Sequence, residues 1–87
     1  MELKSEIINV IKENLFGILP ELDKERISND DSFVDLGANS VDRAELLMLT
    51  LERLNVEVSR IEFVSAQTIN HLADLIMKKR QDSNLRK

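Results

Sequence analysis

The sequence predicts an all-α protein, a four-helix bundle with a short third helix and a long loop between the first two helices. Apolar residues recur at helical spacing in separate segments of the chain, which is the pattern of helices with one buried face. Two glycines and one proline leave little material for the tight turns of β-hairpins. A chain of 87 residues has room for one small core, and we therefore expect one domain.

The first helix is predicted from Leu3 to Ile18. Gly17 and Pro20 mark its end, because proline cannot continue a helix. Its expected buried face repeats every three or four residues and consists of Leu3, Ile7, Ile11, Leu15 and Ile18.

A long connection follows, from residue 20 to residue 39. A loop of more than about 12–15 residues in so small a domain is usually functional or disordered. Phe33, Val34 and Leu36 are apolar residues within this mostly polar stretch, and we predict that they pin the loop to the core. Such pins favour a functional loop over a disordered one.

The second helix is predicted to run from Ser40 to about Leu54. At about 100° per residue, one broad stripe is expected to face the core: Val41, Ala44, Leu47, Met48, Leu51 and Leu54. Leu49 falls outside this stripe and shares the opposite side with Asp42 and Glu45. The helix is therefore expected to have a core face and a mixed acidic and apolar outer face.

The rest of the chain is predicted to hold a short extended link at residues 55–58 and two further helices. Ser59 and Glu62 match a capping box, which should open a short third helix ending near Val64. Thr68 should cap the last helix, whose expected buried face consists of Ile69, Leu72, Ala73, Ile76 and Met77. Residues 81–87 are polar and lack periodicity, so we expect a domain over residues 1–80 and a loose tail over residues 81–87.

Charge and composition disfavour several classes of function. The net charge of −4 disfavours nucleic acid, whose phosphates repel an acidic surface, and suits basic patches on partner proteins. There is no cysteine, so the chain has no thiol nucleophile or thiolate metal site of its own. No apolar run approaches the roughly 20 residues of a membrane span, and the N-terminus is too polar for a secretory signal. We expect a cytoplasmic protein without a membrane segment.

Ser40 is the candidate functional residue. Gly37 lets the chain turn sharply before the predicted helix, which leaves Ser40 exposed at the helix N-terminus. Unpaired backbone amides and the positive end of the helix dipole meet there and favour a phosphate on the Ser40 hydroxyl. The alternative is that Ser40 is only an N-cap, the commoner role of a serine in this position. Arg43, three residues later, does not complete a capping box with it.

The segment Asp35-Leu36-Gly37-x-x-Ser40, followed by an apolar residue, resembles the attachment motif of acyl and peptidyl carrier proteins. The resemblance covers nearly the whole chain. It implies that Ser40 receives 4′-phosphopantetheine from coenzyme A through a separate phosphopantetheinyl transferase, with Asp35, Gly37 and Asn39 forming the motif around it. The thiol that carries acyl thioesters then arrives on the prosthetic group, which agrees with the missing cysteine. The protein implied is a carrier and not an enzyme.

Asn39 and Val41 differ from the Asp and Leu that flank the serine in many family members. The stretch from Gly37 to Arg43 is instead similar to free-standing donor carriers of polyketide β-branching cassettes. That similarity implies acetyl or malonyl cargo and delivery to an enzyme similar to hydroxymethylglutaryl-coenzyme A (HMG-CoA) synthase. It further implies ketosynthase or decarboxylase and acyltransferase partners, and a monomer. Fatty-acid, aminoacyl or peptidyl cargo, and an unmodified helical interaction module, stay open as alternatives.

The carrier family docks its partners through the helix that follows the serine. The equivalent residues here are Val41, Asp42, Arg43, Glu45, Met48, Leu49 and Glu52. Acidic residues on a helix usually form only a solvated face, but Leu49 among them favours contact with a partner. Arg43 is unusual on this face, and we predict that it excludes partners with a basic residue at that point. His71 and Asp30-Asp31 lack the spacing of a catalytic or metal site, so no metal is expected.

Overall fold

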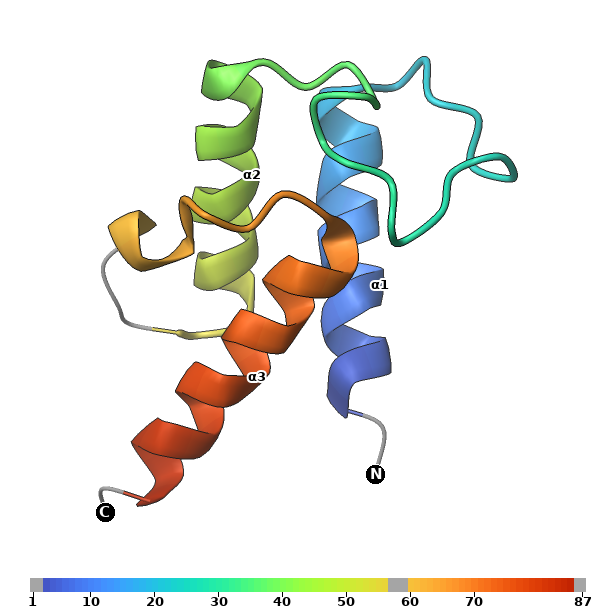
Figure 1. Ribbon diagram of the computed structural model, residues 1–87. Helices are drawn as coiled ribbons and strands as arrows, with labels where there is room; N and C mark the ends of the chain where they lie inside the picture. The colour runs from blue at the N-terminus through green and yellow to red at the C-terminus, as the bar shows by residue number, and fades with distance from the viewer. Residues whose placement is uncertain (1–2, 57–59, 86–87) are drawn as a thin grey trace.

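The computed structural model describes residues 3–56 and 60–85 and contains three α-helices and one short 3₁₀ helix (Figure 1). These elements are α1 (Leu3–Ile18), α2 (Ser40–Arg53), η1 (Arg60–Phe63) and α3 (Ile69–Leu85). The all-helical prediction is confirmed. Where a short third helix is predicted, the structure has the 3₁₀ helix η1 of four residues, and Ser59 of the predicted capping box lies outside the described residues.

Helix α1 is the centre of the fold and packs against both α2 and α3. Figure 1 shows α1 and α2 side by side and running in opposite directions, with the long loop joining their upper ends. The predicted bounds of α1 are confirmed. Ile7, Ile11 and Leu15 are fully buried, as their spacing predicts, and Leu19 extends the last turn through its N–H to the Leu15 carbonyl (2.8 Å).

Half of the predicted core stripe of α2 is confirmed, since Leu51 is buried and Leu47 and Leu54 pack partly against the core. The other half is wrong, because the buried face of the helix is rotated relative to the prediction and leaves Ala44 and two larger residues exposed. Val41 is 72% exposed and Met48 is 40% exposed, whereas Leu46 and Thr50 are buried. Thr50 tolerates burial because its hydroxyl accepts a hydrogen bond from the Asn14 side-chain amide (3.1 Å). Apolar residues lie on several sides of α2, and hydropathy alone therefore identified only part of the buried face.

At residues 55 and 56 the end of α2 is tighter than the predicted extended link, whose residues 57 and 58 lie outside the described residues. Asn55 adopts a positive φ of 57°, a conformation that asparagine tolerates better than most residues. The Asn55 N–H donates to the Glu52 carbonyl (3.2 Å), and the Val56 N–H donates to the Leu51 carbonyl (3.0 Å). This pair of bonds is a Schellman motif, which closes the helix and satisfies its last carbonyls.

The loop between α1 and α2 is held by hydrogen bonds to the segment that precedes α3. Phe33, a predicted pin, is only 3% exposed, and its N–H donates to the Gln67 carbonyl (2.8 Å). The Asn70 side-chain amide donates to Asp30 Oδ1 (2.6 Å). Leu36 packs partly against the core, but Val34 is 56% exposed, so its prediction as a pin is wrong. The loop is thereby fixed directly before the candidate site.

Helix α3 begins as predicted, with the Thr68 hydroxyl accepting a hydrogen bond from the His71 N–H (3.0 Å). Four of its five predicted core residues are buried, Ile69, Leu72, Ala73 and Ile76, and Met77 packs partly against them. The helix continues to Leu85, well into the segment predicted as a tail. Over the described ranges, no helix is long and apolar enough to cross a membrane.

Candidate functional site

The turn before α2 is built on Gly37 and the residue after it. Gly37 has a φ of +102°, a conformation that residues with a side chain rarely adopt, which confirms its predicted role in a sharp turn. Ala38 is buried, and its N–H donates to the Phe33 carbonyl (2.9 Å). The buried Phe33 therefore fixes both ends of the segment that leads into α2, while Asp35 stays exposed on its outer side.

Asn39, and not Ser40, is the N-cap of α2. The Asn39 side-chain oxygen accepts from the Asp42 N–H (2.8 Å), and Asp42 Oδ2 accepts from the Asn39 N–H (3.2 Å). Together these two bonds form a complete capping box. The alternative in which Ser40 serves only as the cap is wrong, since the cap lies one residue earlier. An Asn-x-x-Asp spacing in the sequence carries this signal.

Ser40 is consequently an exposed residue in the first turn of α2 that the cap does not need. The capping box uses the N–H groups of Asn39 and Asp42, and the N–H groups of Ser40 and Val41 have no partner among the described residues. Free amides at the positive end of a helix dipole stabilise an anion. A phosphodiester on the Ser40 hydroxyl fits this position.

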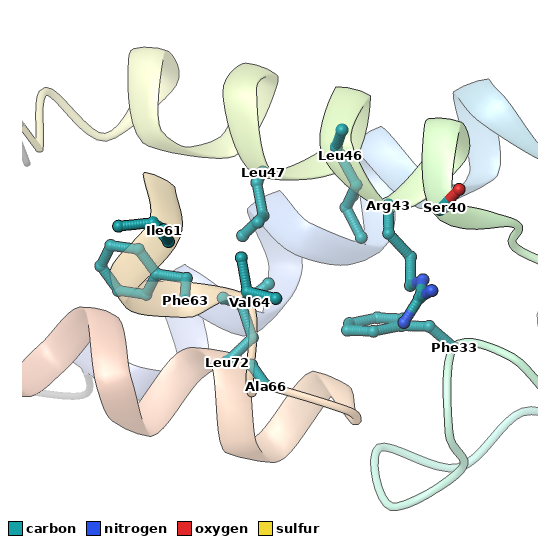
Figure 2. A pocket seen from close by; sticks show the side chains of 11 residues that line it. Phe33, Ser40, Arg43, Leu46, Leu47, Ile61, Phe63, Val64, Ala66 and Leu72 are labelled. Carbon is teal, nitrogen blue, oxygen red and sulfur yellow. The ribbon is translucent and has the colours of Figure 1, made fainter. Parts of the chain in front are cut away.

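A cavity of about 400 Å³ opens beside Ser40, between α2, η1 and the start of α3 (Figure 2). Most of the residues around it are apolar, including Phe33, Leu46, Phe63 and Leu72. Among the described residues that line it, Ser40 and Arg43 are the only polar ones. The arrangement places a modifiable hydroxyl at the edge of an apolar cavity.

Arg43 belongs to this cavity and not to the outer face of α2. At 3.6 residues per turn it lies about 160° around the helix from Val41. Figure 2 shows its side chain extending from α2 toward the ring of Phe33. Its Nε atom is buried without a hydrogen-bond partner among the described residues. The structure thus separates Arg43 from the predicted docking residues, and the predicted exclusion of basic partners loses its geometric basis.

Four other predicted docking residues form a single exposed stripe on α2. Val41, Glu45, Met48 and Glu52 are exposed and repeat at intervals of three and four residues. Asp42 is half-buried and occupied by the capping box, and Leu49 is half-buried at the margin of the stripe. The stripe alternates apolar and acidic side chains along its length. We name these four residues the α2 stripe.

The side chains of Asp30 and Asp31, the acidic pair of the loop, have structural partners. Asp31 Oδ2 accepts from the Ser28 N–H (2.8 Å), and Asp30 holds Asn70 at the start of α3. Within residues 3–56 and 60–85, no group of three or more metal-ligating side chains is found. His71 is exposed on α3, on an element that does not carry Ser40. Asp30 and Asp31 therefore order the loop and the start of α3, and they have structural roles.

Fold and site together define a small helical carrier: a bundle that presents a free serine at a helix N-terminus beside an apolar cavity. The chain belongs to the phosphopantetheine attachment site family, which matches residues 7–76. The cofactor of proteins in this family is 4′-phosphopantetheine, attached covalently. Membership of the family identifies the protein as an acyl carrier and not a catalyst.

Two relatives and one solved structure illustrate the similarity. The polyketide biosynthesis acyl-carrier-protein AcpK of Bacillus subtilis (strain 168) is 40% identical over 80 residues, which cover 92% of this chain and 98% of AcpK. The acyl carrier protein of Buchnera aphidicola subsp. Acyrthosiphon pisum (strain Tuc7) is 40% identical over 70 residues, 79% of this chain and 86% of that protein.

The solved structure is the crystal structure of the curacin biosynthetic pathway HMG synthase in complex with acetyl donor-ACP. One of its chains superposes with a TM-score of 0.77 and 39% identity, over 83% of this chain and 92% of that one. The match confirms the expected fold of an acyl carrier protein.

Proposed function

We propose that this protein carries acyl groups on a phosphopantetheine arm attached to Ser40, for use in polyketide biosynthesis. The observation that carries the proposal is that different residues cap α2 and offer the free hydroxyl at its start. Asn39 and Asp42 cap the helix, so the Ser40 hydroxyl is left exposed beside the cavity and available for modification.

The residues around Ser40 suit the arm in different ways. The N–H groups of Ser40 and Val41, which have no partner within residues 3–56 and 60–85, would stabilise the phosphodiester. Gly37 and Phe33 fix the turn from which the serine projects, and the cavity offers apolar surface beside it. The arm supplies the thiol that holds acyl groups as thioesters when it is bound. We further propose that η1 is the third helix of the four-helix carrier fold.

We propose acetyl or malonyl as the cargo and an HMG-CoA synthase-like enzyme of β-branching as a recipient. Two similarities support this assignment: the relative AcpK is a polyketide carrier, and the superposed chain comes from a complex of an HMG synthase with an acetyl-donor carrier. A phosphopantetheinyl transferase, an acyltransferase and a ketosynthase or decarboxylase are the other partners of the proposed cycle.

The α2 stripe is the proposed docking surface for these partners. Val41 and Met48 provide exposed apolar contact area, and Glu45 and Glu52 provide negative charge beside it. Acidic side chains around an apolar centre suit a basic patch on an enzyme and speed its association, an effect that salt weakens. Glu45→Lys should therefore slow transfer more at low salt than at high salt.

A transfer assay tests the proposed recipient. The protein is loaded with [¹⁴C]acetyl-phosphopantetheine and mixed with an HMG synthase of a polyketide β-branching pathway, with a fatty-acid carrier loaded in the same way as the control. The proposal expects acetyl transfer from this protein at a rate at least about tenfold above the control, equivalent to about 1.4 kcal/mol of transition-state selectivity. Equal rates from both carriers would contradict the β-branching assignment and leave the carrier function standing.

A further inference from the structure

The guanidinium of Arg43 is the one charged group that residues 3–56 and 60–85 place in the lining of the cavity beside Ser40. Its Nε is buried, and within residues 3–56 and 60–85 its side chain makes no hydrogen bond or salt bridge. A buried donor without a partner is unfavourable, and in folded proteins such groups are rare. The geometry therefore indicates a site that is completed by a ligand oxygen.

We propose that Arg43 binds the free carboxylate of a dicarboxylic acyl cargo, such as malonyl, at the entrance of this cavity. The inference rests on the proposed function, since the cargo arrives on the arm at Ser40. The Nε–H and an adjacent Nη–H lie along one edge of the planar guanidinium, and this edge matches the two oxygens of a carboxylate. A neutral acetyl or butyryl group offers no such pair of acceptors.

The direction of the side chains favours the cargo over the phosphodiester of the arm as the ligand. Figure 2 shows the Ser40 hydroxyl pointing away from Phe33, whereas the Arg43 side chain extends toward it. The phosphodiester is bonded to that hydroxyl, next to the free amides of the α2 N-terminus. Arg43 faces the other way, into the apolar space where a folded-back acyl group would lie. A partly desolvated guanidinium discriminates strongly between an anionic and a neutral ligand there.

The test measures the Arg43 Nε–Hε group directly by NMR. The ¹⁵N-labelled protein is converted to its holo, acetyl, butyryl and malonyl forms with coenzyme A, its three thioesters and a phosphopantetheinyl transferase. Loading of each form is verified by intact mass. Solvent exchange of Nε–Hε is then compared, and the resonance is assigned by its loss in Arg43→Lys. A charge-assisted hydrogen bond should slow this exchange by about tenfold or more in the malonyl form alone.

Arg53 provides the matched control on the same helix. It pairs with Glu13 on the surface (2.6 Å), away from the cavity, so its Nε–Hε exchange should be equal in all four forms. Slowing of Arg43 exchange already in the holo form, and to the same extent in all forms, would identify the phosphodiester as the ligand and overturn the proposal. Verified loading with no slowing in any form would overturn it as well. Absence of a mass gain would instead refute the proposed carrier function, on which the inference depends.

Discussion

Asn39→Ala should lower the free energy of unfolding and Ser40→Ala should leave it nearly unchanged, because only Asn39 caps α2. Asn39→Ala removes the oxygen that accepts the Asp42 N–H at 2.8 Å, while the reciprocal bond from the backbone N–H of residue 39 can still form. Loss of an N-cap acceptor costs about 0.5–2 kcal/mol, and we expect a value near 1 kcal/mol because Asn39 is exposed and water replaces part of the bond. For a domain of this size, that loss lowers Tm by about 4–8 °C.

The assay is urea denaturation of the unmodified protein, followed by circular dichroism at 222 nm. Ser40→Ala should change the free energy of unfolding by less than about 0.5 kcal/mol, the range of an exposed side chain without a structural partner. Asn39→Asp serves as the conservative control, since it keeps an acceptor at the cap and should retain stability. A loss in Ser40→Ala as large as that in Asn39→Ala would refute the assignment of the cap and with it the argument that Ser40 is free.

Three further predictions concern the stability of the loop, turns and helices around the site. Phe33→Ala should lower the free energy of unfolding by about 3–5 kcal/mol, measured in urea, because the ring is buried against the core; a loss below 1 kcal/mol would contradict its role as a pin. Gly37→Ala should cost about 1–3 kcal/mol from its φ of +102°, although a Cβ there meets no atom within 4 Å. Gly17→Ala, equally free of contacts but without a positive φ and in the last turn of α1, should instead stabilise by about 0.4–1 kcal/mol; the same sign at both glycines would contradict the backbone argument. Thr50→Val should destabilise by about 1–3 kcal/mol because it leaves the Asn14 amide without its acceptor, and an unchanged stability would show that this bond contributes nothing.

The fold was predictable where local pattern and tertiary contact agree. In α1 the apolar residues lie on one side, so periodicity alone identified Ile7, Ile11 and Leu15 as core. In α2 they lie on several sides, and the buried arc is decided by contacts with α1 that a single segment does not reveal. Thr50 illustrates the difficulty, because its burial depends on Asn14, which lies 36 residues earlier.

Ser40 and the glycine turn before it were predictable from the sequence, whereas the cap and the position of Arg43 were not. Gly37 and Ser40 stand in a segment that resembles the attachment motif of carrier proteins, and the positive φ of Gly37 confirms the sharp turn expected before Ser40. The alternative that makes Ser40 the N-cap lies one residue too late, although Asn39 and Asp42 have the spacing of a capping box. Arg43 was expected on the outer face, since nothing in the sequence shows that α2 turns this residue toward η1 and Phe33.

The most direct test of the central claim is intact mass spectrometry of the protein after incubation with coenzyme A, Mg²⁺ and a broadly acting phosphopantetheinyl transferase. We expect complete gain of one phosphopantetheine in the wild-type chain and in Ser5→Ala, which changes an exposed serine on α1 away from the cavity, and no gain in Ser40→Ala. Peptide mapping should place the group on Ser40. A folded Ser40→Ala protein that still gains the group, or a wild-type chain that gains none from a transferase active on a control carrier, would contradict the claim.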